Sequence, residues 1–288
     1  MKTILIPTDF SENSVHAAEY GFYLAQQLKA KVLLCNAIII PAEMPQTGMV
    51  VWQADEYDLI KEESDLELSI LKTRLSGMEN IFFHEPEIEV VNQSGTVIDV
   101  VNSLYQEHNA EMIVVGAHTK SGLSTFVLGS HTNKLIDHAA GPILVVPPLT
   151  PLKPITNIAF ATDFNHIDED LHYIYKLIKF AKLLKAKILL THIYNDKKES
   201  PGFIETIERF VLELSNKADY PNIYYRLVKN TSPESGLHWL NEQSHVDMLV
   251  MVHRQHSILD SIFIGSHTHK MASQIKVPLM VYQSKNKA

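Results

Sequence analysis

The segment T-I-L-I-P-T-D-F at residues 3–10 decides the fold, because it returns as N-I-A-F-A-T-D-F at residues 157–164. A second match follows each of these segments. L-K-A-K-V-L-L at residues 28–34 corresponds to L-K-A-K-I-L-L at residues 184–190. Matches that keep their order along a chain indicate a duplicated structural unit. The sequence therefore predicts two copies of one domain, joined head to tail.

A third match completes the pattern, because G-S-H-T-N-K-L at residues 129–135 corresponds to G-S-H-T-H-K-M at residues 265–271. We place the two copies at residues 1–149 and 153–288. The proline-rich stretch P-P-L-T-P-L-K-P at residues 147–154 is expected to be a short, stiff joint between them. A chain of 288 residues is long enough for two domains of ordinary size.

Apolar runs typical of buried strands alternate with segments of helical periodicity in the first copy. We predict strands at residues 3–7, 31–40, 87–91, 112–115 and 142–147, and helices at residues 13–29, 53–76, 96–108 and 130–140. This alternation is typical of a parallel sheet with helices on both faces. The predicted class is α/β, with two tandem doubly wound domains, each a five-stranded parallel sheet of order 3-2-1-4-5.

Bulk composition limits the partners and the compartment. The formal net charge of −8 gives no electrostatic attraction to nucleic acid or to anionic membranes. No apolar run approaches the roughly 18 residues of a membrane span, and the amino terminus lacks a signal-peptide pattern. We therefore expect a soluble cytoplasmic protein. Its single cysteine, Cys35, permits no internal disulfide and is expected to be buried as a small apolar residue.

Polar residues follow the predicted strands at the place where this topology binds ligands. Ligands of doubly wound sheets lie beyond the carboxyl ends of the strands, where the strand order reverses. For the order 3-2-1-4-5, that place is between the first and the fourth strand. Thr8 and Asp9 follow the first strand, and Gly116 follows the fourth. Asp9 can accept a hydrogen bond from an adenine amino group or from a ribose hydroxyl.

The fourth predicted helix of the first copy begins at Gly129-Ser130-His131-Thr132. The amino terminus of a helix presents free N–H groups and the positive end of the helix dipole, which suit a phosphate. Gly129 allows close approach to the backbone, and Ser130 can donate its hydroxyl. The sequence therefore predicts a nucleotide site at this edge of the first copy.

These residues resemble the universal stress protein family in its tandem form, whose signature is G-x2-G-x9-G-[ST]. Gly116 matches the first glycine, Gly129-Ser130 match the final pair, and Asp9 matches the aspartate after the first strand. The resemblance implies binding of ATP or ADP, with Mg²⁺. It implies that Asp9 and Ala37, near the end of the second strand, hold adenine. The signature residues would then contact the ribose and the phosphates.

The chain departs from that signature in both copies. Thr119 stands where the second glycine belongs. In the second copy, Val252 and Gln255 occupy the two glycine positions, and only Asp163 and Gly265-Ser266 remain. Because a valine cannot offer the close approach of a glycine, we expect the second copy to have a degenerate site.

A purely architectural interpretation of the shared residues stays open. Ser130 and Ser266 are preferred residue types for helix N-caps. Asp9 and Asp163 can accept hydrogen bonds from loop N–H groups before a helix. Retention of these residues in both copies fits this interpretation, which favours an interaction module that does not depend on nucleotide.

An enzyme or a metal site is less favoured by the sequence. It contains no G-x4-G-K-[ST] loop, no G-x-G-x-x-G and no G-x-S-x-G elbow. We assign no catalytic residues, although His118 or His131 could act as the base of a slow ATP hydrolase. The 15 histidines include no tight Cys/His cluster, and we assign no metal ligands, with zinc as the alternative.

The last apolar run of each copy, residues 142–147 and 277–282, falls at a sheet edge in this topology. An exposed apolar edge strand invites pairing. In the family that the chain resembles, the fifth strands of two domains pair across a two-fold axis. We therefore predict an intramolecular pseudo-dimer, and a further homodimer of the whole chain stays open. The sequence names no protein partner.

Overall fold

The computed structural model describes residues 2–39, 54–119, 126–127, 130–162, 164, 166–194, 201–230, 235–236, 239–240, 245–254 and 277–284. It describes the backbone alone for residues 54–56, 118–119, 126–127, 130–131 and 201. The chain forms two compact units. The first contains residues 1–116 and 130–142, and the second contains residues 117–129 and 143–288.

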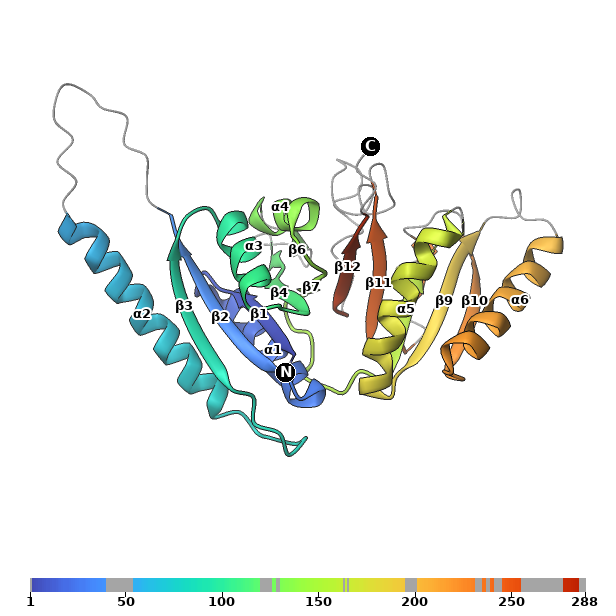
Figure 1. Ribbon diagram of the computed structural model, residues 1–288, viewed down its shortest axis with the longest axis horizontal. Coiled ribbons are helices and arrows are strands. Elements are labelled where there is room, and N and C mark those ends of the chain that lie inside the picture. Colours follow the sequence, from blue (N-terminus) through green and yellow to red (C-terminus); the bar gives the residue numbers. More distant parts are fainter. Residues whose placement is uncertain are drawn as a thin grey trace, which may run out of the picture. The chain divides into compact units, whose positions relative to one another are not determined.

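The first unit alternates strands and helices as expected (Figure 1). Its strands are parallel and lie in the order β3-β2-β1-β4. Helix α1 contacts α2, and α3 contacts α4. The elements are β1 (Thr3–Pro7), α1 (Glu12–Leu28), β2 (Lys31–Ile38), α2 (Ala54–Ser76), β3 (Ile88–Ser94), α3 (Val97–Glu107), β4 (Met112–Gly116) and α4 (Ser130–His138).

The second unit repeats the pattern, and its parallel strands lie in the order β10-β9-β8-β11-β12, which is the predicted 3-2-1-4-5. Its elements are β8 (Asn157–Ala161), α5 (Ile167–Leu184), β9 (Lys187–Tyr194), α6 (Pro201–Ala218), β10 (Ile223–Lys229), β11 (Met248–His253) and β12 (Leu279–Gln283). The predicted class, a doubly wound α/β fold in tandem, is confirmed.

Strand β7 (Ile143–Val146), the last strand of the first copy, lies in the second unit. It pairs antiparallel with β12, and Leu144 faces Met280 in the register. All four β7 residues are buried. The predicted pairing of the two last strands is therefore confirmed.

Two short strands that the sequence did not predict lie between β4 and α4 in the chain. Strand β5 (His118–Thr119) pairs antiparallel with β6 (Phe126–Val127). Two-residue strands leave no periodicity for a sequence pattern to show.

Helix α1 illustrates why the sequence folds as it does. Ser11 is its N-cap and accepts a hydrogen bond from the Ser14 N–H, and the helix ends at Lys29, which has a left-handed backbone. Its buried face includes Gly21, where an added Cβ would lie 2.6 Å from Cδ1 of Ile6. The missing side chain lets the helix approach β1 closely. In the described part of the chain, no helix has the length and apolar character needed to cross a bilayer.

Candidate functional site

A tight turn follows β1 in the first copy, and Thr8 organises it. The Thr8 N–H donates to the carbonyl of Cys35 at 2.8 Å, and its buried hydroxyl lies 3.0 Å from that of Ser14. The same hydroxyl accepts the N–H of Phe10 at 3.0 Å, and Phe10 has a left-handed φ of 61°. This turn directs the intervening Asp9 toward solvent, where Asp9 is exposed.

Asp9 has the architectural role that its sequence position allowed. Its Oδ1 accepts the N–H of Ser11 at 3.1 Å and the hydroxyl of Ser11 at 2.6 Å. Because Ser11 is also the N-cap of α1, the carboxylate is attached to the start of that helix. These bonds fix its orientation while leaving the residue exposed, so a structural role and a ligand contact are compatible.

Gly116, at the end of β4, is required by packing against α1. An added Cβ would lie 2.5 Å from the carbonyl oxygen of Asn13 and 3.3 Å from the backbone nitrogen of Ser14. The hydroxyl of Thr132, buried in α4, donates to the Gly116 carbonyl at 3.3 Å. The ends of β1 and β4 and the starts of α1 and α4 therefore meet at one place, as predicted.

Ala37 lies half-buried near the end of β2, beside Gln93 of β3. Its neighbour Asn36 donates from Nδ2 to the carbonyl of Thr8 at 2.8 Å. The Oδ1 of Asn36 lies 3.0 Å from the hydroxyl of Ser64, a buried residue of α2. A polar chain thus connects α2, β2 and the turn after β1. The sequence patterns did not reveal it, because no motif marks single polar residues inside apolar periodic segments.

The remaining predicted residues are described only in part. Ser130 and His131 are the first residues of α4, so this helix begins where the sequence predicted, and Thr119 belongs to β5. The side chains of these three residues, and all of Gly129, lie outside the described structure. The described residues contain no group of three or more His, Cys, Asp or Glu arranged to hold a metal ion.

The second copy keeps the same turn after β8. The hydroxyl of Thr162 accepts the N–H of Phe164 at 2.9 Å, and Phe164 has a φ of 56°. His192 replaces Asn36, and its Nδ1 lies 3.1 Å from the carbonyl of Thr162. Asp163 lies outside the described residues. The shared Thr-Asp-Phe segment therefore encodes a backbone turn in both copies.

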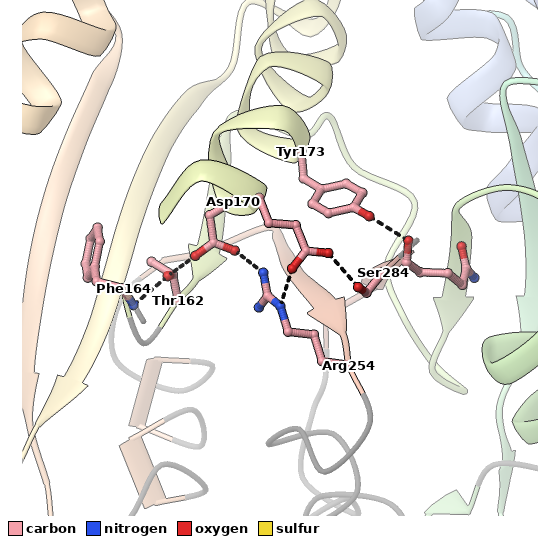
Figure 2. Close-up of polar contacts among 8 residues, drawn as sticks. Thr162, Phe164, Asp170, Tyr173, Arg254 and Ser284 are labelled. Atoms are coloured by element: carbon pink, nitrogen blue, oxygen red, sulfur yellow. Dashed lines mark hydrogen bonds and ion pairs between the residues drawn. The ribbon is translucent and has the colours of Figure 1, made fainter. Parts of the chain in front are cut away.

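The two copies differ beyond that turn, because Asp170 takes the place of Ser14 and recruits an arginine (Figure 2). The hydroxyl of Thr162 donates to Oδ2 of Asp170 at 2.5 Å. Arg254, which follows β11, donates to Oδ1 of Asp170 at 2.6 Å and to Oε2 of Glu169 at 2.9 Å. Ser284, which follows β12, donates to Oε1 of Glu169 at 2.5 Å. We call these five residues the Arg254 cluster.

The Arg254 cluster lies where the strand order of the second copy reverses, between the paired strands β8 and β11. Burial alone would raise the pKa of Glu169, but hydrogen bonds from Ser284 and Arg254 outweigh burial and lower it. Burial alone would lower the pKa of Arg254, but Asp170 and Glu169 outweigh burial and raise it. Glu169 and Arg254 are therefore charged at neutral pH and form an ion pair.

Aromatic rings gather beside this cluster, at the ends of β8 and β9. The ring of Phe164 lies 5.6 Å from that of His192 and 6.0 Å from that of Phe210, measured between centroids. Phe203 of α6 lies 5.1 Å from His192. These aromatic side chains thus lie at the part of the second copy that corresponds to Thr8 and Asn36 in the first.

The model of the universal stress protein family matches residues 1–147 and 154–283. Universal stress protein G of Salmonella typhimurium is 30% identical over 148 residues, which cover 50% of this chain and 98% of that protein. Universal stress protein G of Shigella flexneri is 39% identical over 148 residues, which again cover 50% of this chain and 98% of that protein. A universal stress protein structure from Archaeoglobus fulgidus covers 98% of both chains with a TM-score of 0.72 and 17% identity. The similarity to the Archaeoglobus fulgidus structure shows that this chain has the same fold.

Proposed function

The chain belongs to the universal stress protein family in tandem form, and we propose that its first copy binds ATP or ADP, with Mg²⁺, as a regulatory ligand. The observation that carries this proposal is the contrast between equivalent places in the two copies. In the first copy, the exposed Asp9 is held in place beside the end of β1. In the second, the Arg254 cluster lies at the corresponding end of β8. The proposed stoichiometry is therefore one nucleotide per chain.

The residues of the first copy suit such a ligand. The fixed carboxylate of Asp9 is an acceptor for an adenine amino group or a ribose hydroxyl. Helix α4 begins at Ser130, and its first N–H groups and positive dipole end would hold phosphate, with which Mg²⁺ would enter. Ala37 at the end of β2 would form an apolar wall for the base.

We propose binding without turnover. The described side chains that bond around Thr8 are the hydroxyls of Ser11 and Ser14, the amide of Asn36 and the carboxylate of Asp9. A general base must accept a proton from an attacking water. Asp9 is the one carboxylate among them, and we assign it to the adenine or the ribose. We therefore propose a cytoplasmic regulatory role for the chain in a stress response, rather than an enzymatic one.

Isothermal titration with ATP·Mg²⁺ and ADP tests this proposal, using matched aspartate variants of the two copies. Asp9→Asn removes the charge and keeps an acceptor for Ser11, so we expect about tenfold weaker binding, or about 1.4 kcal/mol. Asp163→Asn changes the equivalent residue of the second copy and should leave binding unchanged. Two sites per chain, or equal losses in both variants, would contradict the proposal.

A second candidate function is a nucleotide-independent interaction module of the same family. Gly116 favours it, because packing against Asn13 explains this glycine without a ligand. Under this alternative, the melting temperature stays the same in ATP, ADP or AMP. By contrast, a ligand at 100 times its Kd would stabilise the native state by about 2.7 kcal/mol.

A further inference from the structure

Helix α2 has an apolar face on each of two opposite sides. One side packs on β2 and β3 and buries Ser64, Leu68, Leu71 and Leu75. The other side carries Leu59, Leu66 and Ile70, whose exposed fractions are 65%, 61% and 53%. Steps of seven and four residues place these three side chains along one line of a helix. In Figure 1, α2 runs along β3 with one side turned away from the strands.

We call Leu59, Leu66 and Ile70 the outer α2 face. A single exposed leucine is ordinary on a protein surface. Leu66 and Ile70 are one turn apart and Leu59 is two turns before Leu66, so these three side chains, each more than half exposed, form an apolar row along the helix. Such a row on a helix of 23 residues is a suitable surface for another helix.

The distribution of charge along α2 favours a second α2 helix, in antiparallel orientation, as the partner of this face. Residues 57–66 contain four acidic side chains and one basic, whereas residues 67–76 contain one acidic and two basic. A parallel pair of α2 helices would bring two acidic halves together. An antiparallel pair brings Glu63 of one helix near Arg74 of the other, because both residues flank the outer α2 face on the same side. Arg74 is oriented on the surface by Glu19, at 2.6 Å, and its side chain remains 58% exposed.

We propose that the outer α2 face docks on the same face of a second copy of this chain, with the two helices antiparallel about a two-fold axis between Leu66 and Ile70. A two-fold interface uses one self-complementary patch on both partners. Leu66 of one copy then packs against Ile70 of the other. The acidic half of each helix faces the basic half of its partner. This interface does not depend on nucleotide binding.

Sedimentation equilibrium of the full chain tests the interface. We expect a concentration-dependent dimer of the wild-type protein. Leu66→Glu should raise the dimer Kd at least about tenfold, because it places a carboxylate at the axis. Leu212→Glu is the matched control, because Leu212 is 63% exposed on the equivalent helix α6. Unchanged far-ultraviolet circular dichroism spectra establish that both variants fold. A wild-type monomer at high concentration, or a dimer unaffected by Leu66→Glu, overturns the proposal.

Cysteine cross-linking tests the antiparallel orientation. The native Cys35 is buried, and burial raises the pKa of its thiol to about 12, so it does not compete for reagent. Leu66→Cys should join two copies through a short bismaleimide, because residue 66 lies beside the axis. Leu59→Cys should not, because its two copies would be separated by on the order of 25 Å at 1.5 Å per residue. Equal cross-linking of both variants would indicate parallel helices and overturn the proposal.

Discussion

At the scale of single residues, the two copies preserve a turn and differ in what surrounds it. The hydroxyls of Thr8 and Thr162 accept the N–H of Phe10 and Phe164 at 3.0 Å and 2.9 Å. The residue that contacts the threonine hydroxyl differs, however. It is Ser14 in the first copy and Asp170 in the second. A buried carboxylate needs a charged partner, and Arg254 supplies one.

The sequence allowed an architectural role for Asp9 and Asp163 after the first strand of each copy, but it predicted neither the threonine-centred turn nor its different surroundings. Thr8, Asp9, Gly116 and Thr132 lie at the predicted end of the sheet, because the strand order determines which strand ends meet there. The Arg254 cluster was not predicted. Its charged residues are scattered along the chain, and no motif connects residue 254 with residue 169. Alignment of the two copies provides a signal, since a serine corresponds to a buried aspartate.

Replacing Arg254 with alanine should destabilise the protein by about 2 kcal/mol, because Glu169 and Asp170 would keep partly buried charges without a cationic partner. Urea unfolding at pH 7 measures the loss. Arg209→Ala, on the exposed surface of α6, is the control and should change little. In a Glu169→Gln/Asp170→Ser background, Arg254→Ala should cost much less. An equal cost in both backgrounds would refute the role given to the carboxylates.

At the scale of elements, β4 and β11 meet their neighbouring helices differently. Gly116 lets the first turn of α1 approach β4, whereas the corresponding Val252 is buried at the end of β11. Helix α5 starts at Ile167, and its N-cap, His166, makes no side-chain hydrogen bond. Acidic residues in its first turn interact favourably with the helix dipole instead. Periodicity predicted these helices and strands, but close approach of backbones from distant segments leaves no local pattern.

Exchanging the residues at the ends of β4 and β11 should destabilise both copies. Gly116→Val should cost about 2 kcal/mol, because its Cβ would overlap the backbone of Asn13. Val252→Gly should cost a similar amount, because it removes a buried side chain. Urea unfolding measures both. Tolerance of Gly116→Val within about 0.5 kcal/mol would show that α1 moves away easily, and that the glycine is retained for another reason.

The joint between the copies is attached to β11 through Asp247. Burial alone would raise the pKa of this carboxylate, but Lys153, Thr156 and Asn157 outweigh burial and lower it. Its Oδ2 accepts the N–H groups of Thr156 and Asn157, both at 2.9 Å. Because the pKa is lower in the folded state, the resulting stability is complete above the ordinary aspartate pKa of about 3.9. It is lost as the pH falls through the folded-state pKa.

Asp247→Asn should therefore lower the free energy of unfolding by about 1–2 kcal/mol at pH 7, because the charged acceptor is removed. The difference from wild type should shrink as the pH falls below about 4, where this carboxylate becomes protonated in the unfolded wild-type chain but is still ionised in the folded one. Urea unfolding between pH 3 and pH 7 follows this change. Asp58→Asn, at an exposed position of α2, is the control. A difference that stays constant with pH would exclude ionisation of Asp247 as its cause.

At the scale of the whole molecule, the boundary between the two sequence copies differs from the boundary between the two compact units. The family model matches residues 1–147 and 154–283, yet β7 belongs to the second compact unit. The apolar character of both last strands predicted that they would pair. Their register, with Leu144 facing Met280, was not predictable, because buried strands are apolar on both faces. The joint thus allows β7 to complete the edge of the other copy.

Dividing the chain at the joint, after residue 149, should yield two halves that recognise each other. The second half alone would expose the edge of β12, which β7 otherwise covers, and exposed apolar edges associate. We expect residues 150–288 to aggregate or self-associate when expressed alone. Co-expression with residues 1–149 should instead yield a soluble 1:1 complex, detected by size-exclusion chromatography with light scattering.

Val281→Pro provides the matched test of this complex, because the N–H of Val281 lies on the side of β12 that pairs with β7, opposite Ile143. This variant should abolish association of the halves and lower the melting temperature of the intact chain. A proline at Ile204, in the exposed first turn of α6, should leave association intact. Stable, monomeric halves that do not bind each other would mean that β7 and β12 contribute little to folding. The pairing would then be a result of tethering, since a short joint raises the effective concentration of two strands that bind weakly on their own.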